Sequence, residues 1–151
     1  MGIVVLDASP LGLVSSPKAS GANEECRHWL RSLLAQSVRV ILPEIADYEV
    51  RRELLRSGRT AGVRRLDQLK RSLIYQPLTT ETMLLAATFW ADVRRRGRPT
   101  ADVSALDGDV ILAAQASIAS RAGDQVVVAT SNMSHLSLFV SAEEWRSIST
   151  S

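Results

Sequence analysis

The sequence predicts an α/β domain, a three-layer α/β/α sandwich with helices on both faces of a mostly parallel central sheet. Apolar runs such as "IVVL" and "VVVA" are continuous rather than alternating, which is typical of strands buried on both faces. Segments with apolar residues at spacings of three and four separate these runs, as helices do between parallel strands. The length of 151 residues fits one domain that spans residues 1–151.

Four strands are expected, each an apolar run bounded by polar or turn-forming residues. Pro77 places the third strand at an edge of the sheet, because proline cannot donate a hydrogen bond to a neighbouring strand. After the fourth strand, a loop or short helical turn is expected, and a polar segment closes the chain. The four strands cover residues 2–7, 38–43, 74–78 and 125–131.

Six helices are expected between these strands, from apolar periodicity and from residues that favour helix ends. The first begins with Ser9 as N-cap and Pro10 at the first helical position. The last begins at Asp109, after a loop over residues 97–108, and ends at Gly123. The six helices cover residues 8–14, 23–37, 44–58, 61–73, 80–96 and 109–123.

The composition predicts a soluble globular protein, with 46% hydrophobic and 23% charged residues. No apolar run approaches the roughly 20 residues that a membrane span needs, so no membrane association is expected. Nothing at the N-terminus resembles a signal peptide. The single cysteine, Cys26, cannot form an internal disulfide, which favours a reducing compartment, and we expect a cytoplasmic location.

Basic residues are concentrated in two clusters, although the net charge is only +2. Arginine suits phosphate recognition, and such clusters supply sequence-independent affinity for nucleic acid. The alternative explanation is a coding bias toward arginine on solvated helix faces. If the clusters are functional, the residues expected to bind RNA are Arg51, Arg52, Arg94 and Arg95.

Acidic residues are predicted to converge at one edge of the sheet. Asp7 ends the first strand, Glu49 lies in the first two turns after the second strand, and Asp107 and Asp109 open the helix before the fourth. In parallel sheets, ligands bind at the carboxyl ends of the strands, where these positions meet. Converging carboxylates repel one another unless a cation neutralises them, and oxygen ligands suit Mg²⁺ or Mn²⁺.

Each acid also has a structural explanation. Asp7 is placed to cap the first helix. On a solvated helix face, either Glu49 pairs with Arg52 or Glu53 pairs with Arg56, and either Asp107 or Asp109 serves as an N-cap. The remaining candidates, Asp47, Asp102 and Asp124, are expected to be ordinary loop or helix-surface acids.

Four segments, in order, resemble the PIN domain, the ribonuclease fold of the toxin in VapBC-type toxin–antitoxin pairs. They are "IVVLDAS", "LPEIADYEVRREL", "DGDVILAAQA" and "VVVATSNMSHL", and they span nearly the whole chain. The resemblance implies a parallel α/β/α sandwich and an endoribonuclease that depends on Mg²⁺ or Mn²⁺. It also implies frequent homodimerisation and inhibition by a small antitoxin protein.

Matched by position, the resemblance implies that Asp7, Glu49 and Asp109 are the catalytic acids. Asp7 and Asp109 are then the expected metal ligands, with Asp107 as an extra carboxylate, and Glu49 orients or deprotonates water. The family's fourth acid is replaced by Asn132, which removes one negative charge and weakens divalent-cation affinity. The residues expected to support the site are Thr130, Ser131, Asn132 and His135.

Other functions fit the same sequence less well. Because the fourth acid is missing, one alternative is a PIN-fold protein that has lost cleavage activity and acts as an RNA-binding or regulatory protein. A receiver-type signalling domain needs a lysine after its last strands, but the last lysine here is Lys70. A phosphatase of the haloacid dehalogenase type needs a second aspartate two residues after Asp7, where Ser9 stands.

Overall fold

The computed structural model describes residues 2–97 and 103–150, and it contains a five-stranded sheet in which every pairing is parallel. The strand order is β3-β2-β1-β4-β5, so the first strand lies at the centre. The strands are β1 (Ile3–Leu6), β2 (Arg39–Pro43), β3 (Ile74–Gln76), β4 (Val126–Thr130) and β5 (Ala142–Glu144).

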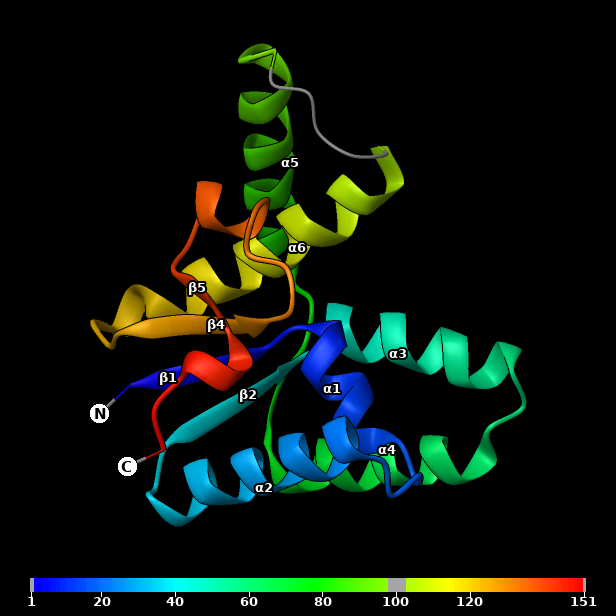
Figure 1. Ribbon diagram of the computed structural model, residues 1–151. Coiled ribbons are helices and arrows are strands. Elements are labelled where there is room, and N and C mark those ends of the chain that lie inside the picture. Colours follow the sequence, from blue (N-terminus) through cyan, green and yellow to red (C-terminus); the bar gives the residue numbers. More distant parts are fainter. Residues whose placement is uncertain (1, 98–102, 151) are drawn as a thin grey trace.

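Helices cover both faces of this sheet, which makes the three layers visible in Figure 1. One layer contains α1 (Ala8–Ser15), α2 (Gly21–Ala35), α3 (Glu44–Arg56) and α4 (Thr60–Ser72). The opposite layer contains α5 (Thr80–Arg95) and α6 (Val103–Ala119), which pack against each other. No helix in the described part of the chain is long and apolar enough to cross a membrane.

The central strand β1 divides the core between these layers. Because side chains alternate along a strand, Val4 and Leu6 join the core beneath α1 to α4, whereas Ile3 and Val5 join the core beneath α6. All four side chains are buried, which explains why this strand reads as a continuous apolar run. The α/β/α architecture expected from the sequence is therefore confirmed.

A buried glutamine connects α6 to α3 and to the end of β3. Gln115 of α6 is fully buried, and its Oε1 accepts a hydrogen bond from the Ile45 backbone N–H at the start of α3, at 3.2 Å. Its Nε2 donates to the Gln76 carbonyl at 2.9 Å, and the Gln76 amide donates back to the Gln115 carbonyl at 2.9 Å. These bonds fix α6 against α3 and the end of β3.

Three expectations about the elements need correction. The first helix begins at Ala8 with Asp7 as its N-cap, because the Asp7 carboxylate accepts from the Ala8 N–H; Ser9 is already helical. The last long helix begins at Val103, so Asp107 and Asp109 lie inside it and neither is an N-cap. The fifth strand was missed.

The expected loop over residues 97–108 is helical from residue 103, and its residues 98–102, including Asp102, lie outside the described part of the chain. Asp47 is not a surface acid. It is buried, and its carboxylate accepts from Arg51 at 2.9 Å, which compensates the charge that burial removes from water.

Candidate functional site

The candidate site lies at the carboxyl edge of the sheet, between β1 and β4. Asp7 directly follows β1, and Thr130 is the last residue of the neighbouring β4. Both Asp7 oxygens are held: Oδ1 accepts from the Ala8 N–H and Oδ2 from the Thr130 hydroxyl, each at 2.7 Å. Thr130 is fully buried, so this carboxylate is fixed by a rigid partner.

Glu49 reaches this edge from α3 and lies against the backbone of α6 at Gly108. A Cβ atom added at Gly108 would stand 2.9 Å from Glu49 Oε2, closer than real Cβ contacts allow. The glutamate carboxylate therefore occupies the space that any other residue at position 108 would fill. Glu49 forms no hydrogen bond or ion pair with another described residue, whereas the expected alternative pairing of Glu53 with Arg56 is present at 2.8 Å.

Electrostatic interactions connect Asp7, Glu49 and Asp109. Burial raises the pKa of Asp7, although hydrogen bonds from Thr130 and Ala8 partly offset this increase. Burial, followed by the charges of Asp7 and Asp109, raises the pKa of Glu49. Burial and the charge of Asp7 likewise raise the pKa of Asp109. The charge of Asp7 thus disfavours ionisation of Glu49 and Asp109, the charge of Asp109 also disfavours that of Glu49, and a bound cation would relieve this repulsion.

The loop after β4 forms the opposite wall of the site. The Asn132 N–H donates to Thr130 Oγ1 at 3.0 Å, and the Ser131 N–H donates to Ser9 Oγ at 2.9 Å, which ties this loop to α1. The Asn132 side chain is turned into its own loop, where Oδ1 accepts from both the N–H (3.2 Å) and the hydroxyl (2.8 Å) of Ser134.

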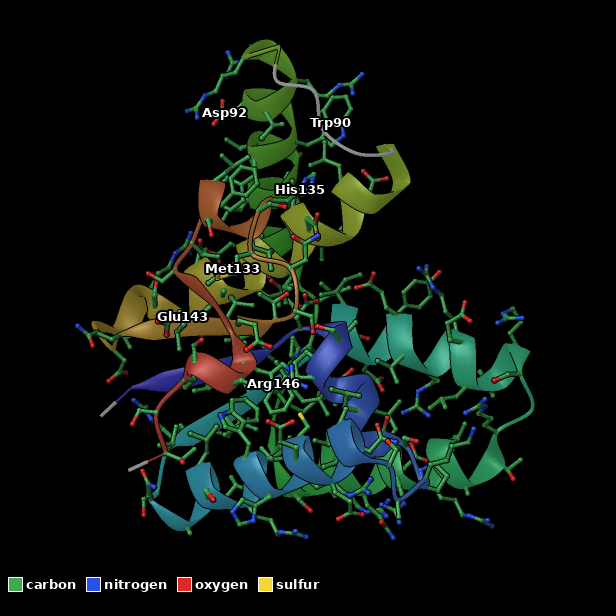
Figure 2. All side chains as sticks on the ribbon, in the orientation of Figure 1. Trp90, Asp92, Met133, His135, Glu143 and Arg146 are labelled. Carbon is green, nitrogen blue, oxygen red and sulfur yellow. The ribbon has the colours of Figure 1, made fainter. Side chains whose placement is uncertain are left out.

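His135 is the residue of this loop that lies beside Asp109. Figure 2 shows it on the segment that follows β4, beside α6, and its Nδ1 lies 3.9 Å from Asp109 Oδ2. Its side chain is 22% exposed. The next residue, Leu136, is almost fully buried and anchors the loop to the core beneath α6.

Asp107 does not join the other carboxylates. Residues two positions apart on a helix point about 200° away from each other, and Asp107 lines a groove between α5 and α6 with Met83 and Trp90. Because Asp109 faces Asp7 instead, the extra carboxylate expected from the sequence lies outside the site.

The four arginines expected to bind RNA are not brought together. Arg51 pairs with Asp47 and with Asp67, both at 2.9 Å, and so connects α3 to α4. Arg52 lies 5.1 Å from the ring centre of Tyr48 and is near enough to Glu49 to lower its pKa.

The other two, Arg94 and Arg95, lie in the last turn of α5, which points away from the sheet in Figure 1. Arg95 pairs with Asp92, and Arg94 lies 5.4 Å from the ring centre of Trp90.

A cleft of about 580 Å³ leads away from the site between α1 and α3. Ala8, Ser9 and Glu49 lie at one end, and Arg56 and Arg59 at the other. Sequence reasoning missed Arg56 and Arg59, which stand in the same arginine-rich segment as Arg51 but lie along this cleft. It also missed Gly108, for which a small residue between two acids in "DGD" was the available signal.

The donor atoms of the site suit a hard divalent cation, since three carboxylates contribute only oxygen. The raised pKa values of Glu49 and Asp109 beside other acids also indicate a place for positive charge. Within residues 2–97 and 103–150, however, no three histidine, cysteine or acidic side chains stand together closely enough to chelate an ion as a group. The residues therefore fit Mg²⁺ or Mn²⁺ by chemistry, and side-chain rotation would have to bring the ligands together.

Comparison with known proteins gives similarity at the level of the fold. No protein-family model matches the chain, and no curated protein sequence matches it. Solved structures do match. One is VapBC2 from Rickettsia felis, solved bound to a DNA fragment from their promoter: the chains are 13% identical with a TM-score of 0.69, over 93% of this chain and 97% of that chain.

Two other structures are similar to the same extent. FitAcB from Neisseria gonorrhoeae is 18% identical with a TM-score of 0.67, over 96% of this chain and 99% of that chain. VapBC-1 from nontypeable Haemophilus influenzae is 14% identical with a TM-score of 0.67, over 95% and 98%. These matches cover nearly the whole of both chains, so they establish a shared fold from end to end.

Proposed function

We propose that this chain, which shares its fold with chains of VapBC and FitAB complexes, is a metal-dependent endoribonuclease and the toxin of a type II toxin–antitoxin pair. The observation that carries the proposal is the convergence of Asp7, Glu49 and Asp109, from three separate elements, at the carboxyl edge of the sheet. A small antitoxin, a second copy of this chain and an RNA substrate are the proposed partners.

The three carboxylates have different environments and so different roles. Asp7 is held by two hydrogen bonds and, with Asp109, would bind Mg²⁺ or Mn²⁺. When bound, the cation would supply positive charge to stabilise the transition state of phosphodiester hydrolysis. Glu49 has no hydrogen-bonding partner among the described residues, and its raised pKa makes it a stronger base. It would orient the attacking water and accept its proton.

The arginines along the cleft would bind the RNA backbone at phosphates away from the reacting one. Arg59 forms no ion pair with a described residue, and it stands at the far end of the cleft from Glu49. A guanidinium at that position can contact a phosphate without first breaking a salt bridge. Arg51, in contrast, is occupied by two carboxylates, so we propose Arg59 rather than Arg51 for this contact.

The test is RNA cleavage by matched aspartate variants on one helix. Asp109→Asn is expected to abolish cleavage in Mg²⁺ or Mn²⁺, whereas Asp107→Asn, on the other side of α6, is expected to cleave as the wild type does. Glu49→Gln is expected to slow cleavage by about 10²- to 10⁴-fold. Equal losses in the Asp107 and Asp109 variants would contradict the assignment.

The second candidate function is a PIN-fold protein that binds RNA without cutting it. Asn132 favours it, because this amide stands where the family has a fourth acid and its oxygen is occupied by Ser134. RNA binding that survives in EDTA, with no cleavage in any divalent metal, would establish this function instead.

A further inference from the structure

We infer that His135 supplies a nitrogen ligand to the metal of this site and makes it selective for Mn²⁺ over Mg²⁺. The inference rests on the proposed function, because it concerns the same metal. The sequence suggested Asn132 as the replacement for the fourth acid. The structure gives Asn132 a different role, and it places His135 Nδ1 3.9 Å from Asp109 Oδ2.

The oxygen of Asn132 is not available to a cation. Both of its lone-pair directions are used by hydrogen bonds from Ser134, one from the backbone N–H and one from the hydroxyl. Binding a metal would require breaking these two bonds and opening the turn. The same turn brings the chain back toward α6, so the residue that reaches the site is His135.

The position of His135 suits a ligand. Two atoms bound to one ion at about 2.1 Å each lie at most about 4.2 Å apart. Nδ1 of His135 and Oδ2 of Asp109 are 3.9 Å apart, inside this limit, so a small rotation of these side chains would let one ion bind both. The distance is too long for a hydrogen bond. The imidazole forms no hydrogen bond to any other described side chain or backbone group, although its side chain is only 22% exposed.

The nitrogen ligand decides the choice of metal. Mg²⁺ strongly prefers oxygen ligands and water, whereas imidazole is a good ligand for transition-metal ions. Mn²⁺ accepts both carboxylate oxygen and imidazole nitrogen. A site built from Asp7, Asp109 and His135 therefore favours Mn²⁺ relative to a site with four carboxylates, which both ions fit.

The experiment detects the nitrogen directly, without relying on cleavage. Mn²⁺ is bound to the full chain, and electron spin echo envelope modulation records nitrogen nuclei coupled to the metal. The chain has two histidines, so His28→Gln is a matched control: His28 is exposed on α2. Nitrogen modulation is expected in the wild type and in His28→Gln, and it is expected to disappear in His135→Gln.

Calorimetric titration gives the accompanying affinities. His135→Gln is expected to weaken Mn²⁺ binding by about 10- to 100-fold and to change Mg²⁺ binding by less than about twofold. A thermal melt confirms that the variant is folded, and His135→Ala repeats the measurement without a new amide. Two results would overturn this inference but not the metal-dependent function. One is wild type that binds Mn²⁺ without nitrogen modulation, and the other is modulation that persists in both His135→Gln and His135→Ala. Absence of Mn²⁺ binding in the wild type would overturn the metal-dependent function as well.

Discussion

Replacing Gly108 by alanine should separate activity from stability. The added Cβ would stand 2.9 Å from Glu49 Oε2, and ordinary contact begins at about 3.4 Å, so the carboxylate must move by about 0.5 Å. A displacement of about 1 Å can cost about a hundredfold in rate, and catalytic groups must be held to within about 0.5 Å. Gly108→Ala is therefore expected to slow RNA cleavage about tenfold.

The same substitution should leave the fold intact. Gly108 lies inside α6, where alanine is favoured over glycine by about 0.5–1 kcal/mol. The atom that must move is the end of a long side chain that no described partner holds, so its displacement costs little. The melting temperature is expected to stay the same or to rise by about 2–4 °C.

The assay combines single-turnover cleavage with a thermal melt on the same preparations. Gly21→Ala is the control, because a Cβ added at Gly21 of α2 meets nothing within 4 Å. It should preserve cleavage. If Gly108→Ala cleaves within twofold of the wild type, Glu49 is not held where the structure has it or is not needed there. If Gly108→Ala instead melts earlier, position 108 matters for packing rather than for the site.

Three further predictions follow from the buried groups. Because the pKa of Asp109 is raised in the fold, this carboxylate costs the metal-free chain stability as pH rises from about 4. In EDTA at pH 7.5, Asp109→Asn should therefore melt at a higher temperature than the wild type, and a difference that does not narrow toward pH 4 would contradict this. Thr130→Val removes the hydroxyl that donates to Asp7, and denaturant unfolding should show a loss of about 1–3 kcal/mol; an unchanged midpoint would count against this role. Burial raises the pKa of Cys26 to about 12. A thiol reagent at pH 8 should therefore modify Cys26 in the folded chain at least about a hundredfold more slowly than in the chain unfolded by guanidinium, and equal rates would show that the thiol is accessible.

Local sequence patterns were sufficient for the layered fold and for bringing three acids into one candidate site. Strands such as Ile3–Leu6 are buried on both faces, and this leaves a continuous apolar run that can be recognised without a structure. Asp7 then follows from the rule that parallel strands present their carboxyl ends to ligands. Glu49 and Asp109 followed from their places relative to strand ends and from the family resemblance.

Elements without a strong local pattern were missed. The strand Ala142–Glu144 has three residues, two of them acidic, and lies at the edge of the sheet, so it has no apolar run to reveal it. Its place is decided by pairing with β4, which is a contact between distant parts of the chain.

The direction in which each polar side chain points, and the residue with which it pairs, were decided only by the tertiary structure. The sequence shows Asp107 and Asp109 as neighbours, but the rotation of α6 against α3, fixed through Gln115, turns only Asp109 toward Asp7. The sequence likewise shows Arg51 among other arginines, but folding pairs it with two carboxylates. Hydrophobic pattern is a property of the local chain and determines the elements. The face that each polar side chain presents depends on how packed elements are rotated and on which charges they bring within reach, and this is settled only when the chain folds.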